Sequence, residues 1–207
     1  MAVRLSRSDR KAQTRSDLTA AARSVFLRRG FHGASLDEIA EEAGYTKGAV
    51  YSNFSGKDEL FIAVLEEHYA QRTRAYSELV FEDDDVEATY RAVARYMFDA
   101  YAAEPAWWTL VSDFATHASR DPELRARLHS AREGFLDAMA QIIEELGQRH
   151  GIVYRLPARE IARGSGALMR GMVTEWLIGP NAQVEDFEEM HAAYLWGLAV
   201  PRERSTP

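Results

Sequence analysis

The stretch SLDEIAEEAGYTKGAVYSNFSGK, residues 35–57, determines the fold, because it predicts two short helices joined by a tight turn. Ser35 followed by Glu38 forms a capping box, in which the hydroxyl accepts a backbone N–H and the carboxylate reaches back to the cap. One apolar face then recurs at helical spacing: Leu36, Ile39, Ala40 and Ala43. Gly44 ends the first helix, since glycine adopts a left-handed conformation without cost.

The second helix of this stretch has a surface that does not suit a protein core. Thr46 caps it, and Val50 and Phe54 bury its inner face. The outward residues are small, polar and weakly basic: Thr46, Lys47, Ala49, Ser52 and Asn53, with Tyr51 on the flank. Such a helix suits a DNA major groove about 12 Å wide, where hydroxyls and amides meet base edges. The sequence therefore predicts a DNA-reading helix-turn-helix.

Residues 9–65 resemble the DNA-binding domain of the tetracycline-repressor (TetR) family of bacterial regulators. The match is ordered and free of gaps, and it includes Ala21, Ala22, Phe26, Gly30, Phe31, Ser35, Ile39, Ala40, Ala43, Gly44, Lys47, Gly48, Val50, Tyr51, Phe54, Lys57, Glu59 and Leu60. Residues 66–207 resemble the family only as a helical regulatory half of suitable length. We therefore expect a helix-turn-helix DNA-binding domain over 1–56 and a helical ligand-binding and dimerisation domain over 57–207.

The periodicity is helical nearly throughout, which predicts an all-α fold of about nine helices and no strand. The expected helices span 9–29, two segments within 36–54, 57–80, 86–103, a segment from Pro105, a long segment from 122 to about 146, 157–178 and 184–199. Residues 1–8 form a basic arm, in which either Arg4 and Arg7 contact DNA or the arm is disordered.

Charge is distributed unevenly along the chain. Residues 1–57 hold ten Lys/Arg and six Asp/Glu, a net +4, whereas residues 58–207 hold fifteen and twenty-six, a net −11, so the total is −7. A basic N-terminal part on an acidic body is typical of a protein that presents only one end to phosphates.

Composition also indicates the cellular compartment in which the protein is expected. The 207 residues contain no cysteine, which excludes disulfides and fits a reducing cytosol. The start of the chain is charged and lacks an apolar run, so no signal peptide is expected, and no uncharged apolar stretch approaches the roughly 20 residues of a membrane span. We expect a cytoplasmic protein without membrane association.

Motifs of enzymes are missing from the sequence. It has no Gly-rich phosphate loop, no His-Glu-x-x-His and no Gly-x-Ser-x-Gly. The six histidines are dispersed, so we expect no metal site, no cofactor and no catalytic residue. The alternative from another class is a helical enzyme or carrier whose N-terminal helices only resemble the DNA-binding motif.

The resemblance and the residue chemistry together assign roles on DNA. By resemblance, Tyr51 and Lys57 contact phosphates. Ser35 and Thr46 lie at helix N-termini, where oxygens and N–H groups meet phosphate, and Gly48 allows close approach of the backbone. The candidates for contact with base edges are Lys47, Ala49, Ser52 and Asn53.

The middle of the chain is rich in aromatic residues and methionine. The candidate lining of an effector site is Tyr96, Met97, Tyr101, Trp107, Trp108, Phe114, His117, Met139, Met169, Met172 and Trp176. Such a lining suits an apolar or aromatic small molecule, although the same stripe is also typical of an ordinary core. A ligand cavity in this region is what the resemblance implies.

Helix-turn-helix proteins gain specificity as dimers on two half-sites, so we expect a homodimer on a double-stranded operator. The candidate interface comes from the last two helices: Phe187, Tyr194, Leu195 and Leu198. The expected function is a ligand-responsive repressor. In it, a small-molecule effector moves the 57–80 helix and thereby changes the spacing of the two DNA-binding domains.

Overall fold

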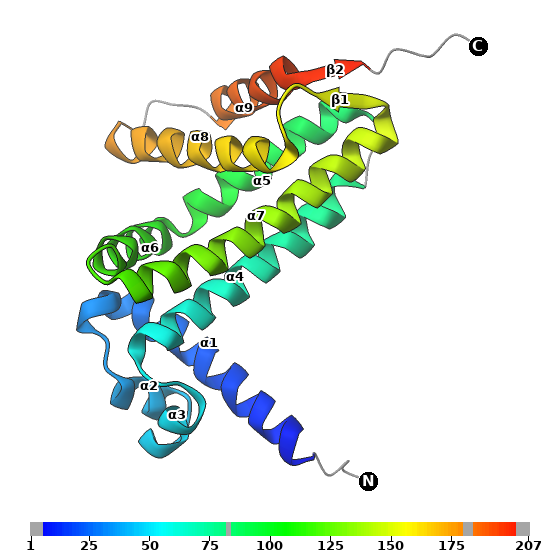
Figure 1. Ribbon diagram of the computed structural model, residues 1–207. Coiled ribbons are helices and arrows are strands. Elements are labelled where there is room, and N and C mark those ends of the chain that lie inside the picture. The colour runs from blue at the N-terminus through cyan, green and yellow to red at the C-terminus, as the bar shows by residue number, and fades with distance from the viewer. Residues whose placement is uncertain (1–5, 82–83, 180–183, 202–207) are drawn as a thin grey trace. The chain divides into compact units, whose positions relative to one another are not determined.

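The computed structural model describes residues 6–81, 84–179 and 184–201. These residues form nine helices and one two-stranded ribbon (Figure 1). The helices are α1 (Arg7–Gly33), α2 (Leu36–Glu42), α3 (Lys47–Asn53), α4 (Lys57–Val80), α5 (Val86–Ala103), α6 (Pro105–Ala118), α7 (Pro122–His150), α8 (Ala158–Ile178) and α9 (Val184–Leu198). The all-α prediction is confirmed. No helix of the described residues combines the length and the apolar character that a membrane crossing requires.

The chain divides into two compact units. The N-terminal unit comprises Met1–Tyr69 and Ala106–Ala131, and the C-terminal unit comprises Ala70–Pro105 and Arg132–Pro207. Helices α4 and α7 therefore each contribute residues to both units. The functional boundary expected between residues 56 and 57 stays a prediction, since compactness groups the start of α4, most of α6 and the start of α7 with the DNA-binding motif.

Helix α1 begins and ends through local chemistry. Ser6 and Asp9 form a reciprocal capping box, in which Asp9 N donates to Ser6 Oγ and Ser6 N donates to Asp9 Oδ2, both at 3.1 Å. The helix thus starts at Arg7, two residues earlier than the sequence pattern predicts, and Arg4 lies outside the described residues. Gly30 interrupts the helix with φ 69° and ψ 168°, and a short turn follows it. The predicted stop at Gly30 is confirmed.

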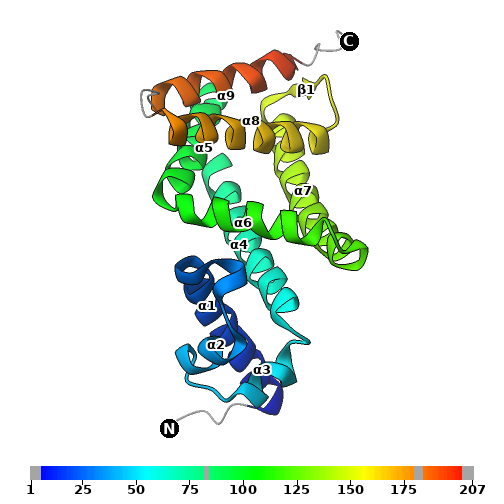
Figure 2. The ribbon, with the colours of Figure 1, turned by 90° about the vertical axis from the view of Figure 1, so that its left-hand side faces the viewer.

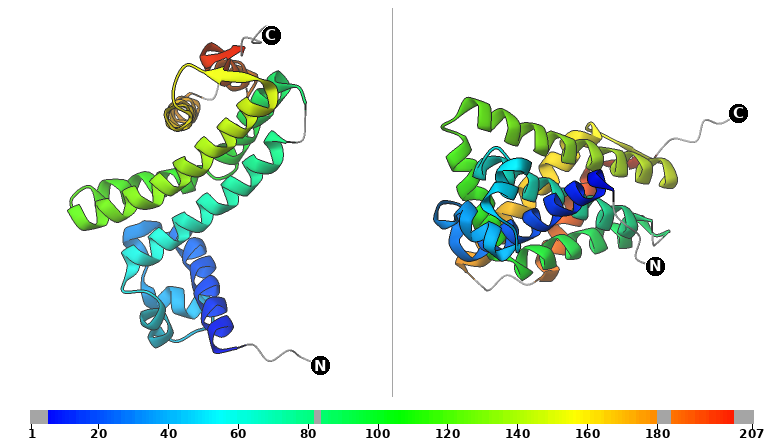
Figure 3. Two further views of the ribbon diagram at one scale, coloured as in Figure 1. Left: turned by 45° about the vertical axis from the view of Figure 1, so that its right-hand side comes forward. Right: turned by 90° about the horizontal axis from the view of Figure 1, so that it is seen from below.

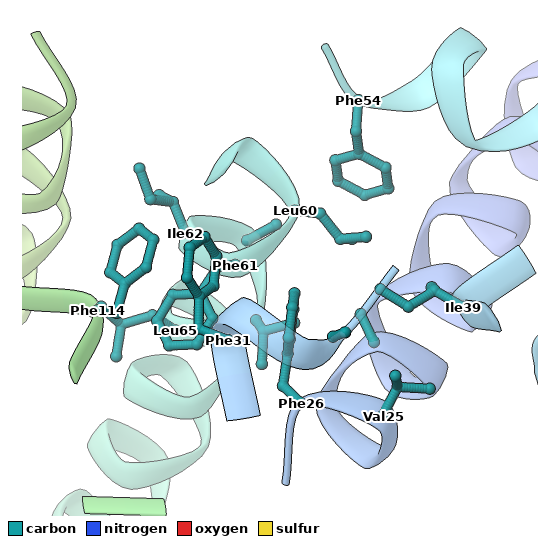
Figure 4. Packing of buried hydrophobic residues seen from close by; sticks show 14 of the residues in the cluster. Val25, Phe26, Phe31, Ile39, Phe54, Leu60, Phe61, Ile62, Leu65 and Phe114 are labelled. Carbon is teal, nitrogen blue, oxygen red and sulfur yellow. The ribbon is translucent and has the colours of Figure 1, made fainter. Parts of the chain in front are cut away.

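Aromatic rings form the core of the N-terminal unit. Phe61 of α4 and Phe31 lie between Phe26 of α1 and Phe114 of α6 (Figure 4). The ring centroids of Phe61 and Phe114 are 4.1 Å apart, and those of Phe26 and Phe61 are 5.2 Å apart. Trp107 joins this core and is wholly buried. This cluster packs α6 against the helices of the DNA-binding motif. Truncating one such ring to alanine costs about 3–5 kcal/mol, so the packing stabilises the unit strongly.

The C-terminal unit is built on α5, α8 and α9, which gather side by side (Figure 2). Phe98 of α5 contacts Phe187 of α9 with ring centroids 4.4 Å apart, and Trp176 of α8 meets Phe98 at 5.7 Å. The hydroxyls of Tyr90 and Tyr154 are 2.9 Å apart, which gives the buried Tyr90 hydroxyl and the partly buried Tyr154 hydroxyl a partner.

The expectation of no strand is wrong. Strand β1 (Ile152–Tyr154) pairs antiparallel with β2 (Ala199–Pro201); the two strands are the yellow and red arrows of Figure 3. In this register Val153 stands opposite Val200. Gly151, with φ 62°, lies between the end of α7 and the start of β1, where glycine adopts a left-handed conformation without cost. Each strand has only three residues, too few for the alternating pattern by which strands are identified from sequence.

Candidate nucleic-acid interface

The turn between α2 and α3 is set by its caps. Glu38 N donates to Ser35 Oγ at 3.1 Å, and Ala49 N donates to Thr46 Oγ1 at 3.3 Å, so both predicted N-caps are present. Gly44 takes the left-handed conformation with φ 72°. The predicted capping box is only half formed, because the Glu38 carboxylate instead accepts from Arg29 Nε at 3.1 Å. A nearby guanidinium outcompetes a backbone amide for that carboxylate.

Helix α3 has the two faces that the sequence predicts. Val50 is 0% exposed and Phe54 is 1% exposed, whereas Tyr51 is 54% exposed. The other candidates are exposed or partly exposed: Ser35, Thr46, Lys47, Gly48, Ala49, Ser52 and Asn53. In the N-terminal unit, α2 and α3 lie against α1 (Figure 2). The exposed side chains of α3 are therefore the polar ones, whereas Val50 faces the core.

The polar tips near the end of α3 already have partners within the helix. Ser52 Oγ donates to the Ala49 carbonyl at 2.9 Å, and Asn53 Nδ2 donates to the same carbonyl at 2.8 Å. Asn53 Oδ1 is shielded and has no hydrogen-bond partner among the described residues. Both side chains would therefore rotate away from Ala49 before meeting a base edge.

Lys47 is held by an acidic residue of α2. Its Nζ lies 2.8 Å from Asp37 Oδ1 and 2.9 Å from Asp37 Oδ2, and both side chains are largely exposed. This hydrogen bond to Asp37 raises the pKa of Lys47 above its usual value. This contact joins the first residue of α3 to the first turn of α2 through a carboxylate that the sequence analysis did not single out.

Lys57 has partners inside its own unit. Its Nζ donates to the carbonyls of Ala34 at 3.0 Å and His32 at 3.3 Å, and it lies 4.8 Å from the centroid of the Phe31 ring. Partial burial lowers the pKa of Lys57. This ammonium satisfies the carbonyls that follow Gly30, and its contact with phosphate stays a prediction.

Two further charged residues touch α3 and were missed from sequence, Asp37 and Arg15. Arg15 Nη1 donates to the Asn53 carbonyl at 2.6 Å. Arg15 and Asn53 are 38 residues apart, and Asp37 and Lys47 are ten apart. No local spacing rule identifies such pairs, because only the folding of α1, α2 and α3 into one unit brings them together.

The candidate effector residues are divided between the two units. Tyr96, Met97, Tyr101, Met139, Met169, Met172 and Trp176 belong to the C-terminal unit, and Trp107, Trp108, Phe114 and His117 belong to the N-terminal unit. Packing accounts for several of them: Trp107 and Phe114 lie in the aromatic core, and His117 Nε2 is 3.2 Å from Asp58 Oδ1. Their contact with an effector stays a prediction.

The candidate interface residues all lie in the C-terminal unit, but they differ in burial. Phe187 is 2% exposed and Leu195 is 8% exposed within their own unit, and Tyr194 Oη donates to the Ile161 carbonyl at 3.2 Å. Leu198 is partly exposed. The large apolar side chains that α8 and α9 leave exposed are Leu177, Ile178, Met190 and Trp196. The apolar periodicity shows which residues share a stripe, but the side of a helix that faces its own unit depends on the neighbouring helices.

Both the helix-turn-helix region and the C-terminal helices match known families of bacterial regulators. Residues 18–64 match the family model for bacterial regulatory proteins of the tetR family, and residues 86–199 match the C-terminal model for BetI-type transcriptional repressors. The HTH-type transcriptional activator FasR of Mycolicibacterium smegmatis is 31% identical over 207 residues, with 98% of this chain and 89% of FasR covered.

Solved structures share the fold. FadR of Bacillus halodurans, a fatty acid degradation regulator, superposes with a TM-score of 0.66 at 20% identity, covering 89% of this chain and 96% of that one. FadR of Bacillus subtilis in complex with stearoyl-CoA gives a TM-score of 0.64 at 20% identity, covering 88% and 98%. The resemblance drawn from residues 9–65 is confirmed and extends over nearly the whole chain. The chain therefore belongs to the tetR family of bacterial transcriptional regulators.

Proposed function

We propose that the protein is a repressor that binds a palindromic operator as a dimer and is released by an apolar small molecule. The observation that carries the DNA-binding part is the outward face of α3. It is capped by Thr46, buried behind by Val50 and Phe54, and lined with small polar side chains. A short helix of this kind fits a major groove, and its packing against α1 and α2 in the N-terminal unit sets its orientation within that unit.

On the operator, each candidate has a defined task. Lys47, Ala49, Ser52 and Asn53 meet base edges, for which lysine suits guanine, asparagine suits adenine and the alanine methyl suits the thymine methyl. The backbone and side chains at Ser35, Thr46 and Gly48 approach phosphates, together with Tyr51 and Lys57.

Dimerisation supplies a second α3 helix, which reads the second half-site of the operator. A single motif of this size buries little surface on DNA, so useful specificity requires two copies. Exposed apolar side chains on α8 and α9, with Ile178 at 77% and Met190 at 52%, support an interface formed by these helices. Two α3 helices in successive major grooves then require half-sites about 10 base pairs apart, centre to centre.

An apolar effector is supported by the composition of the C-terminal unit and by the stearoyl-CoA complex of the B. subtilis FadR. To change operator occupancy from nearly full to nearly empty, the effector prefers the released state by about 5 kcal/mol. The repressor assignment is supported by the BetI-type repressor match, whereas FasR is named an activator. A reporter gene behind the recovered operator separates these two directions of control.

The primary test is selection of bound duplexes from a random DNA pool by the purified full chain in moderate salt. The proposal expects enrichment of a palindrome, and stearoyl-CoA and shorter acyl compounds are then screened for release of that duplex. A protein that is folded and dimeric yet enriches no sequence, both as purified and after refolding to remove bound ligand, would refute the proposal.

A matched pair of variants locates the binding surface. Ser52→Glu places a carboxylate on the exposed face of α3, and Ser130→Glu places one on an exposed position of α7. We expect Ser52→Glu to abolish operator binding by repulsion from phosphate and Ser130→Glu to leave it intact. Equal loss in both variants, or in neither, would move the DNA-binding surface away from α3.

A further inference from the structure

Arg15 lies in α1, outside the helix-turn-helix, yet it contacts the end of α3. Its Nη1 donates to the Asn53 carbonyl at 2.6 Å, and its Cζ lies 4.1 Å from the centroid of the Phe54 ring. The same nitrogen is 3.8 Å from Glu59 Oε1. One guanidinium therefore joins α1, the last residue of α3 and the first turn of α4.

The contact with Asn53 satisfies a carbonyl that α3 cannot satisfy itself. The last four carbonyls of any helix lack an intrahelical donor, and α3 has only seven residues. A cation at this end also complements the negative end of the helix dipole, and a charged donor makes a strong hydrogen bond. So short a helix is not stable alone, which means that its tertiary contacts fix its direction.

Glu59 extends the contact beyond α3. Its Oε2 accepts from Ser55 N at 2.9 Å and from Ser55 Oγ at 2.7 Å. These hydrogen bonds from Ser55 lower the pKa of the Glu59 carboxyl, so it remains ionised opposite Arg15. Arg15 and Glu59 thus hold both ends of the segment that leads from α3 into α4.

We propose that Arg15 is a positioning residue for DNA reading: it fixes the C-terminal end of α3 through the Asn53 carbonyl without contacting DNA. This inference rests on the proposed function, because it assigns the reading of bases to α3. The competing role is a direct contact with phosphate, since the Arg15 side chain is 42% exposed. The two roles differ in salt dependence, because each phosphate contact contributes about one unit to the slope of log K against log salt.

The experiment compares Arg15→Met, which keeps an apolar stem over Phe54, with Arg15→Lys and with the control Arg28→Met. Arg28 lies on the same helix, and its substitution removes a closer ion pair than that of Arg15, Nη2 to Glu42 Oε2 at 2.8 Å, which joins α1 to α2 instead of α3. For each variant, dissociation constants for the selected operator and for unrelated duplex are measured over a salt series.

We expect Arg15→Met to weaken operator binding about tenfold, corresponding to the loss of one charge-assisted hydrogen bond, with binding to unrelated duplex and the salt slope unchanged. Arg15→Lys recovers part of the loss, because an ammonium reaches the carbonyl but lacks the planar fork. Arg28→Met leaves both constants unchanged. A salt slope reduced by about one unit, with both duplexes weakened alike, assigns Arg15 to phosphate and overturns the proposal.

A second measurement needs no DNA. Amide hydrogen exchange of the protein alone reports the opening of residues 47–54, which we expect to be faster in Arg15→Met and unchanged in Arg28→Met. Equal exchange in wild type and Arg15→Met overturns the positioning role even when a variant binds DNA poorly. Failure of the proposed function has a different signature, since wild-type protein then selects no operator while the exchange difference persists.

Discussion

Acid should destabilise the C-terminal unit through one buried histidine. His191 of α9 is 0% exposed; its Nε2 lies 2.5 Å from Ser165 Oγ, and its Nδ1 has no hydrogen-bond partner among the described residues. Burial lowers the pKa of His191 from 6.5 to about 4, because the charged imidazolium would lose its hydration there. The groups that it meets, the Ser165 hydroxyl and through it the Met97 sulfur at 3.9 Å, carry no charge to compensate.

The sign and size follow from proton linkage. Between pH 6.5 and pH 4 the unfolded chain binds a proton at His191 and the folded chain does not, so lowering the pH favours unfolding. The free energy of unfolding is therefore unaffected by His191 titration above pH 6.5. It decreases as the pH falls from 6.5 to 4, and this decrease levels off below pH 4. A displacement of that size corresponds to about 3 kcal/mol in the free energy of unfolding.

His191→Gln removes the titration while keeping a neutral polar side chain opposite Ser165. Urea unfolding followed by tryptophan fluorescence, at one protein concentration and from pH 4 to pH 7.5, gives the free energy of unfolding of each protein. We expect the stability of the variant relative to wild type to improve by about 3 kcal/mol as the pH falls from 7 to 4. His129→Gln, at an exposed position of α7, controls for the loss of a histidine. A stability difference that is the same at both ends of the pH range would refute the reasoning.

Three further predictions test other parts of the chain. Asp37→Asn releases Lys47, so binding to unrelated duplex should tighten at low salt and its salt slope should steepen by up to one unit, as measured by a salt titration; an unchanged slope contradicts this. Gly44→Ala should lower the free energy of unfolding in urea by about 1–2 kcal/mol, because φ at Gly44 is 72°. Gly134→Ala inside α7, with open space around it, should raise the free energy of unfolding by up to about 1 kcal/mol, and changes of the same sign in both variants contradict this. Ile178→Glu should convert the proposed dimer to monomer in sedimentation equilibrium, and an unchanged mass removes Ile178 from the interface.

The parts of the fold that were predictable from sequence depend on local chemistry. The Ser35 and Thr46 caps, the left-handed Gly44 and the interruption at Gly30 each act within a few residues, and all four are present. The starts of α5 and α7 are equally local, because Asp85 accepts from Glu87 N at 2.9 Å and Asp121 accepts from Glu123 N at 2.8 Å. Pro157 precedes α8 without a side-chain cap. The Ser6–Asp9 capping box is equally local and was available in the sequence, so the late start predicted for α1 was avoidable.

The parts that were not predictable depend on contacts between distant segments. Phe114 packs on Phe61, 53 positions earlier in the chain, which places α6 in the N-terminal unit. The apolar repeat of α9 identifies Phe187 and Leu195 as one stripe, but only the position of α5 shows that this stripe faces inward. Helical periodicity defines a face of a helix, and a separate element decides whether that face is core or interface.

Four of the candidate DNA-contacting side chains already make hydrogen bonds within the protein. In the protein alone, Lys47 pairs with Asp37, Lys57 binds the carbonyls of His32 and Ala34, and Ser52 and Asn53 both donate to Ala49. When one of these four side chains donates to DNA, it would therefore exchange an existing hydrogen bond for a new one, and the net free energy of such an exchange is small.

A correct base sequence must then offer better geometry than the intramolecular partner that it replaces, and an incorrect one leaves the side chain with its partner in the protein. We expect affinity on unrelated DNA to be reduced thereby, because the Lys47 charge is paired with Asp37 and the Lys57 ammonium already donates to two carbonyls. Specificity becomes a difference between two sets of satisfied hydrogen bonds. Under the proposed function, that difference depends on the orientation of α3, whose last residue accepts from Arg15 and whose first residue pairs with Asp37.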